Sequence, residues 1–190
     1  MAVTKDILDN LAPDYESYMT ISPDKHNKLS ERTVKISPKY WDDNYPLIGA
    51  YNYDWTEIKY TELQNHLDTG PESADGVGIY LFIVKPDNQL YGLPGYVYYV
   101  GIAGETEPGR PLSERLREYL AFSQIKKRKA VHNALQYYYR HTYVVYAKVD
   151  LPPEQLRQLE EAFHGFYYPW AGKRDFPPEI KDAQKAWGGV

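Results

Sequence analysis

The chain has 190 residues, a formal net charge of −4 and 43% hydrophobic residues, and it contains no cysteine. This length and composition are typical of one globular domain with a core of its own. The lack of cysteine excludes disulfides, cysteine-based zinc sites and thiol nucleophiles. Because no apolar run reaches the roughly 18 residues that cross a bilayer and the N-terminus lacks a signal-peptide core, we expect a cytoplasmic protein that does not contact a membrane.

Charge and tyrosine content are both unusual. Residues 1–76 carry twice as many acidic as basic side chains, whereas residues 101–145 carry the opposite ratio. A negative total argues against general affinity for nucleic acids, but a basic middle segment can form one face that meets an anion. The 20 tyrosines favour half-buried surfaces, sheet faces and interfaces, because each combines an apolar ring with a polar tip.

Residues 1–75 predict an irregular N-terminal extension with two short helices. The second helix is expected to begin at Asp54, with Glu57 three residues later as a capping box. Its apolar side consists of Tyr60, Leu63 and Leu67. Gly70 and the proline after it end the helix. Between the two helices, residues 39–55 predict a packed loop that carries aromatic side chains onto the main body.

From Gly78 onward the pattern becomes regular. Residues 78–84 and 96–102 predict two strands joined by a loop rich in turn residues. Four further elements follow: a helix over 112–120 with leucines at helical spacing, a helix over 126–140, a strand over 142–149 and a helix over 151–168. This order predicts an α+β fold with a small, mainly antiparallel three-stranded sheet flanked by helices. We expect the domain to span residues 76–172, with a C-terminal tail over 173–190.

Arg115 and Tyr119 are the first pair with chemical potential. They are four residues apart on a predicted helix, so they lie on one face, beside its leucine stripe. The alternative is a surface arginine whose stem covers a tyrosine ring.

Glu160 is the second candidate. With about 100° per residue, it falls at the rim of the apolar stripe of the last helix, whereas Glu161 falls almost opposite that stripe. A carboxylate at a rim can hold a divalent ion or a helix-end partner. The alternative is a solvated glutamate on an amphipathic helix.

Four motifs in this order resemble the GIY-YIG nuclease family. They are Gly78-Ile79-Tyr80, Tyr99-Val100-Gly101, Arg115 with Tyr119, and Glu160 nine positions before Pro169. The likeness covers roughly residues 76–172. Two departures are a longer stretch between Tyr80 and Tyr99 than in compact members and a glycine at position 172, where many members have a supporting asparagine.

The resemblance implies a fold and a set of roles. Glu160 would bind one Mg²⁺ or Mn²⁺, and Arg115 would hold the scissile phosphate by its planar fork. Tyr80 would act as general base or orient the water, supported by Tyr99 and Tyr119. A free tyrosine has a pKa of about 10, so this role needs nearby positive charge, which Arg115 and the metal would supply.

Two further groups belong to the expected substrate-binding surface. Gly78 and Gly101 would leave room for backbone and substrate to approach the tyrosines. A basic run could contact phosphates, and it consists of Lys126, Lys127, Arg128 and Lys129. The alternative for this run is a solvated helix face. The five histidines are interpreted as structural or surface residues, because no second ligand stands at a convincing spacing.

The resemblance therefore predicts a metal-dependent endonuclease that hydrolyses phosphodiester bonds in duplex DNA. The chain is similar in organisation to the small restriction endonucleases of the family, for which a homodimer would supply one site per strand. The extension would then recognise DNA or join subunits. Two alternatives stay open: a catalytically silent DNA- or protein-binding module, and a phage or mobile-element nicking enzyme.

Overall fold

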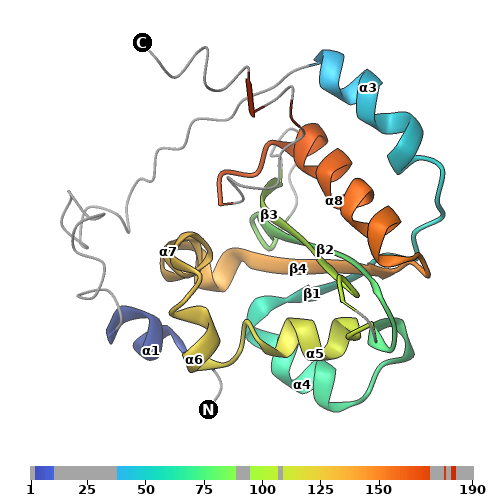
Figure 1. The fold of residues 1–190 in the computed structure, drawn as a ribbon. Coiled ribbons are helices and arrows are strands. Elements are labelled where there is room, and N and C mark those ends of the chain that lie inside the picture. Colours follow the sequence, from blue (N-terminus) through green and yellow to red (C-terminus); the bar gives the residue numbers. More distant parts are fainter. Residues whose placement is uncertain are drawn as a thin grey trace, which may run out of the picture.

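The computed structural model describes residues 3–10, 38–88, 95–106, 109–171, 178 and 181–182, and it has an α+β fold (Figure 1). Its centre is a four-stranded antiparallel sheet in the order β1-β4-β2-β3. The strands are β1 (Thr56–Lys59), β2 (Gly78–Val84), β3 (Tyr96–Ala103) and β4 (Thr142–Lys148). The predicted α+β class is confirmed, but the expectation of three strands is wrong, because β1 adds a fourth.

Strand β1 replaces the start of a predicted helix. Residues 56–59 pair antiparallel with β4, with Ile58 opposite Val144, so the capping box expected at Asp54 and Glu57 does not form a helix start there. β-branched residues favour extended backbone, and the edge of β4 offers backbone groups that need partners. Pairing with β4 therefore overrides the local helix signal. The helical part begins later, in η2 (Tyr60–Glu62) and α4 (Leu63–Asp68).

The β2–β3 hairpin forms as predicted, although its tip at 89–94 lies outside the described residues. Strand β2 is central and pairs with β3 on one side and β4 on the other. Successive side chains of β2 point to opposite faces. Ile79 and Leu81 therefore enter one buried cluster, whereas Tyr80 and Phe82 enter another.

Helices cover both faces of the sheet (Figure 1). Those that follow the hairpin are α5 (Leu112–Arg117), α6 (Phe122–Ile125), α7 (Lys129–Tyr138) and α8 (Pro153–Tyr167). Leu112 and Leu116 of α5 pack in the cluster that contains Tyr80. The apolar stripe of α8, with Leu156 and Leu159, packs in the cluster that contains Ile79. The sheet thus has a face carrying Tyr80 under α5 and an opposite face under α8.

The segment predicted as a packed loop contains a helix, α3 (Pro38–Ile48). The loop interpretation of 39–55 is wrong for the residues of this helix. Contacts with α8 hold α3 in place although Pro46, which disfavours a helix interior, lies inside it. The expectation that this segment carries aromatic groups onto the main body is confirmed. Trp41 Nε1 donates to the carbonyl oxygen of Phe166 on α8 at 3.0 Å.

The first described residues of the N-terminal extension are part of the core. Val3, just before α1 (Lys5–Asn10), and Leu8 within it are buried in the same cluster as Tyr80, and Val3 N donates to Leu120 O at 2.8 Å. Of the predicted tail at 173–190, only residues 178 and 181–182 are described. Within the part of the chain that the structure describes, no helix is long and apolar enough to cross a membrane.

Candidate functional site

Three tyrosines from separate elements meet on the α5 side of the sheet. Tyr80 comes from β2, Tyr99 from β3, and Tyr119 from the turn after α5. The hydroxyl oxygens of Tyr80 and Tyr119 are 2.7 Å apart, and both side chains are fully buried. The Tyr99 ring centroid lies 6.2 Å from that of Tyr80 and 5.8 Å from that of Tyr119. These three predicted residues are therefore brought together.

A β-bulge in the hairpin helps to place Tyr99. The register of β3 against β2 shifts between Phe82 and Ile83, so that one extra residue stands in β3. Such an extra residue lets two successive side chains reach one face. Tyr98 and Tyr99 accordingly both pack in the cluster that contains Tyr80.

Other groups of the protein occupy the space beside the two motif glycines. A Cβ added at Gly101 would lie 2.4 Å from Tyr80 Oη, and one at Gly78 would lie 2.2 Å from the Ala147 carbonyl oxygen of β4. Both glycines thus permit close approach, as the motif predicted. What approaches them in this structure is the Tyr80 ring and the β4 backbone.

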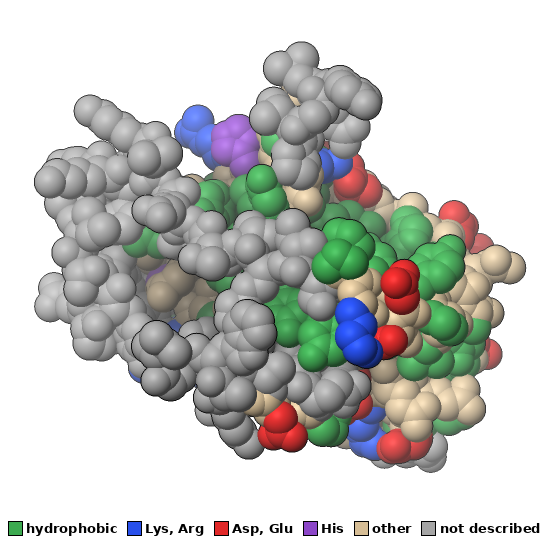
Figure 2. All heavy atoms as spheres, turned by 90° about the horizontal axis from the view of Figure 1, so that it is seen from above, with side chains coloured by type: hydrophobic (Ala, Val, Ile, Leu, Met, Phe, Trp, Pro, Cys, Tyr) green, Lys and Arg blue, Asp and Glu red, His purple; other side chains and the backbone are tan. Residues whose placement is uncertain are grey.

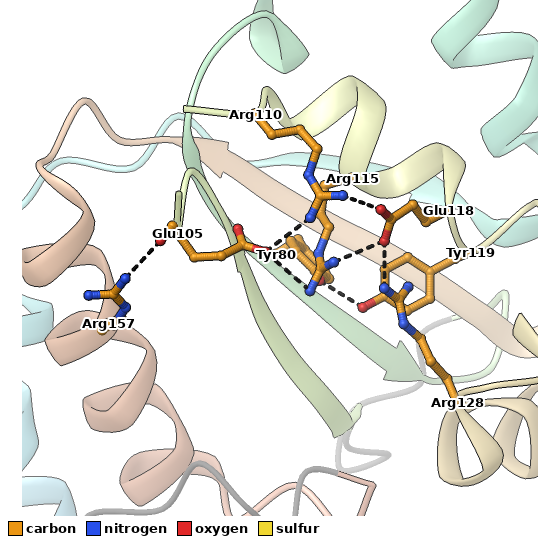
Figure 3. A network of polar contacts seen from close by, with 8 residues as sticks. All are labelled: Tyr80, Glu105, Arg110, Arg115, Glu118, Tyr119, Arg128 and Arg157. Atoms are coloured by element: carbon orange, nitrogen blue, oxygen red, sulfur yellow. Dashed lines mark hydrogen bonds and ion pairs between the residues drawn. The ribbon is translucent and has the colours of Figure 1, made fainter. Parts of the chain in front are cut away.

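Arg115 joins the tyrosines to a charged network (Figure 3). Its Nε donates to Tyr80 Oη at 3.1 Å, and its Nη1 donates to Glu118 Oε2 at 2.9 Å. Its Nη2 lies 3.7 Å from Glu105 Oε1. The predicted arginine therefore contacts the predicted tyrosine, but two carboxylates already share its charge.

Three guanidinium groups converge on Glu118 (Figure 3). Arg128 Nη2 donates to Glu118 Oε2 at 2.5 Å, and Arg110 Nη1 donates to Oε1. Arg128 also lies over the Tyr119 ring, 4.4 Å from its centroid. Arg110 reaches Glu105 at 3.0 Å as well. We call these five charged residues the arginine–glutamate cluster: Glu105, Arg110, Arg115, Glu118 and Arg128.

Sequence reasoning missed three members of this cluster. Glu118 follows Arg115 by three residues, a spacing that puts both on one helix face, so this pair was detectable. Glu105 and Arg110 lie in the irregular segment between β3 and α5, where no periodicity indicates the direction of a side chain. They become visible only when the fold brings that segment against α5.

The pKa values of the buried tyrosines are raised. Burial is the main cause for Tyr80, and neighbouring Tyr99 adds to it, while Arg115 and the hydrogen bond from Tyr119 act in the opposite direction and are outweighed. Burial raises the pKa of Tyr119 in the same way. The expected stabilisation of a phenolate by Arg115 is therefore smaller than the cost of desolvation. Both phenols are therefore uncharged at neutral pH in the substrate-free chain.

Glu160 lies on α8, which covers the opposite face of the sheet. Its side chain is half-buried and that of Glu161 is exposed, as the helical spacing predicted. The helix reaches the arginine–glutamate cluster through Arg157, whose Nη2 donates to the Glu105 carbonyl oxygen at 2.8 Å (Figure 3). The structure thus gathers Tyr80, Tyr99, Arg115 and Tyr119, and holds Glu160 on a different layer.

The described residues offer few ligands for the predicted Mg²⁺ or Mn²⁺. Among the described residues, no three His, Cys, Asp or Glu side chains gather in a group that could hold a metal ion. Mg²⁺ is commonly held by one or two carboxylates, with water and substrate phosphate oxygens completing its shell. Glu160 would supply one carboxylate ligand to such an ion, so water and phosphate oxygens would have to complete its shell.

The predicted basic run is split in two. Lys126, Lys127 and Lys129 are exposed around the start of α7, whereas Arg128 turns inward to Glu118 and Tyr119. Only the three lysines therefore present a solvent-facing basic surface. His132 and His164 are fully buried, in agreement with a structural interpretation.

Comparisons of this chain with protein-family models, with curated proteins and with solved structures found no match. The motifs and the geometry of these side chains are therefore the features that bear on function.

Proposed function

We propose that this protein is a metal-dependent endonuclease that hydrolyses phosphodiester bonds in duplex DNA. One observation carries the proposal: Arg115 Nε donates to Tyr80 Oη, and Tyr80 Oη lies 2.7 Å from Tyr119 Oη. These residues come from β2 and from the region of α5, and the GIY-YIG-like motifs had selected all three. A chance set of motifs would not be expected to produce direct contacts between them.

Phosphodiester hydrolysis needs compensation of charge at the phosphate, a water aimed in line, and help for the departing oxygen. Arg115 provides a planar fork suited to a phosphate. Glu160 would hold the Mg²⁺ or Mn²⁺, which supplies further compensation of charge when bound. Tyr80 orients the water through its hydroxyl, and Tyr119 holds that hydroxyl in place.

The raised pKa of Tyr80 limits its role in the substrate-free chain. A buried neutral phenol donates or accepts a hydrogen bond but does not remove a proton at neutral pH. A base role would therefore require additional positive charge near Tyr80, because positive charge lowers the pKa of a phenol, whereas the DNA backbone itself brings negative charge.

We further propose restriction-type cleavage of both strands. One site per chain then calls for a homodimer, with part of the 1–75 extension available for contacts with DNA or with the second subunit. A nicking enzyme with the same site would cut one strand only. Agarose and denaturing gels of the same reaction separate these two outcomes.

Cleavage of mixed-sequence duplex DNA in Mg²⁺ or Mn²⁺ tests the proposal. We expect fragments from the natural chain, and a loss of at least about 100-fold in rate for Arg115→Lys and Glu160→Gln, since each removes charge compensation or bidentate geometry. Glu161→Gln is the matched control, because its exposed side chain stands next to Glu160 on α8. It should cleave like the natural chain. Thermal melting of each variant checks that it is folded.

A second candidate, a silent binding module, is favoured by the closed state of the site. Tyr80 and Tyr119 are fully buried, and Arg115 is already paired with carboxylates. Binding of duplex DNA without cleavage in either metal, by the folded natural chain, would contradict the endonuclease and support this module.

A further inference from the structure

We propose that Arg110, Arg115 and Arg128 form a binding site for a phosphate group, and that the Glu118 carboxylate fills this site as an internal competitor. The inference rests on the proposed function for the source of the phosphate, a DNA backbone. The site itself is defined by contacts within this chain.

Three arginine side chains converge on the Glu118 carboxylate. Glu118 Oε2 accepts from Arg115 at 2.9 Å and from Arg128 at 2.5 Å, and Oε1 accepts from Arg110. Guanidinium groups are common partners of both carboxylates and phosphates. Each arginine here gives Glu118 one donor, so three donors from three side chains meet at one anionic group, as they could at a phosphate.

One buried donor of the cluster, Arg128 Nη1, lacks a hydrogen-bond partner among the described residues. A buried donor without a partner is costly, because it loses its hydrogen bond to water and gains none in return. Inorganic phosphate has more charged oxygens than a carboxylate, so it can engage Arg128 Nη1 as well as the donors that Glu118 satisfies. A backbone phosphodiester has two charged oxygens, like a carboxylate, and two weaker ester oxygens that can accept a further hydrogen bond.

Solvent reaches part of the arginine–glutamate cluster. The side chains of Arg110 and Glu118 are 30% and 22% exposed, so the site has an opening to solvent. Glu118 is the residue directly after α5, so its side chain can rotate outward without disturbing a helix interior. Once it has left, Glu105 is the one carboxylate that the described residues still place against these arginines, through Arg110 and Arg115, and the excess positive charge attracts an anion.

The site also adjoins the proposed reaction centre. Arg115 bridges Glu118 and Tyr80 through different nitrogens of one guanidinium group. A phosphate that replaces the Glu118 carboxylate would thus be bound by the same Arg115 side chain that donates to the Tyr80 hydroxyl. Displacement of Glu118 is the step that converts the closed site into one that holds substrate.

A purely structural Glu118 would behave differently. In that case its carboxylate only ties the residues around α5 to Arg128, and its loss weakens the fold without any gain in anion binding. Glu118→Gln separates the two interpretations, because the amide keeps the shape and removes the charge.

The test measures binding of inorganic phosphate, and separately of a short DNA duplex, in buffer without divalent metal. We expect Glu118→Gln to bind phosphate about tenfold more tightly than the natural chain, because a competing like charge is gone. Phosphate should also raise the melting temperature of Glu118→Gln by more than it raises that of the natural chain. Asp68→Asn is the matched control, since it removes a carboxylate paired with Arg117 at 2.7 Å outside the cluster.

Equal or weaker phosphate binding by Glu118→Gln, or an equal gain in Asp68→Asn, overturns the proposal. If Glu118→Gln does not fold, phosphate titration of the natural chain decides instead: NMR signals of the Nε–H groups of Arg110, Arg115 and Arg128 should shift together, and unmoved signals overturn it. A gain for the duplex as well as for phosphate identifies a nucleic-acid source, whereas a gain for phosphate alone identifies a small phosphate ligand. Tighter phosphate binding without DNA cleavage would retain this site and remove the endonuclease.

Discussion

Tyr80 is enclosed by groups from three parts of the chain. Gly101 lies under its ring, Tyr119 and Arg115 bond its hydroxyl, and Tyr99 lies beside it. This enclosure fixes the ring and removes it from water. The same enclosure raises the pKa of Tyr80, so precise placement and readiness to lose a proton oppose one another in the substrate-free chain.

Gly101→Ala should destabilise the fold. The added Cβ would lie 2.4 Å from Tyr80 Oη and 2.5 Å from Tyr80 Cζ, far inside normal contact distances. Because the Tyr80 ring is fully buried and bonded to Arg115 and Tyr119, it has little freedom to move away. We expect a loss of about 1–3 kcal/mol in the free energy of unfolding, measured by urea denaturation.

Gly95→Ala is the control for that substitution. Its Cβ would lie 3.1 Å from Ile83 Cγ2, a side-chain methyl that can give way, so the change should be small. A cost for Gly101→Ala no larger than for Gly95→Ala would mean that Tyr80 is less tightly held than described.

The sequence allowed four of the site residues to be predicted. Tyr80, Tyr99, Arg115 and Tyr119 were selected by motif order, and they do contact one another. Glu105 could not be predicted, because its contribution depends on how an irregular segment folds back on α5. The closed state of the site was equally hidden, since residue spacing gives no measure of burial.

At the scale of elements, β1 and η2 hold the extension to the site. Tyr60 is buried, and its hydroxyl donates to the Tyr119 carbonyl oxygen at 2.7 Å. Its ring also packs 5.6 Å from that of Tyr139, centroid to centroid. The backbone of a site residue is thus supported by a segment that sequence patterns had assigned to the extension.

Tyr60→Phe should therefore weaken the fold. The substitution leaves the buried Tyr119 carbonyl without this donor, and a buried polar group that loses its partner costs about 1–3 kcal/mol. Tyr139→Phe is the matched control, because its hydroxyl reaches the Val3 carbonyl oxygen only at 3.5 Å from a partly buried position. Urea denaturation of both variants should give the larger loss for Tyr60→Phe. Equal losses would contradict the proposed support.

Both wrong predictions of elements have the same physical origin. The local interpretation, a capping box at Asp54 and Glu57 and a loop over 39–55, was outweighed by contacts with distant segments. β1 forms against β4, and α3 packs on α8. Elements with strong periodicity, such as α8 and the hairpin, were predicted well because their local pattern and their tertiary contacts agree.

At the scale of the whole molecule, the two faces of the sheet have different characters. The face carrying Tyr80 contains the buried phenols and the arginine–glutamate cluster. The view from above (Figure 2) shows hydrophobic side chains among separate acidic and basic ones, without a continuous basic surface among the described residues that are visible from that side. The proposed function predicts that DNA approaches the cluster, where Arg110 is partly exposed, and the exposed lysines at the start of α7.

The position of Glu160 limits where a phosphate could bind. It lies on the helix that covers the face opposite Tyr80, yet the proposed reaction requires its metal and Arg115 to serve one phosphate. Arg157 and Glu105 join α8 to the cluster at the edge of the sheet. The bound phosphate must therefore lie near that edge rather than over the centre of either face.

The most direct measurement is a crystal structure of Glu160→Gln, chosen to prevent turnover, bound to duplex DNA. The account predicts one backbone phosphate within hydrogen-bond distance of Arg115, the Glu118 side chain turned away from the three arginines, and residue 160 facing the same phosphate. A duplex bound on another surface, with Glu118 still held by Arg110, Arg115 and Arg128, would contradict it.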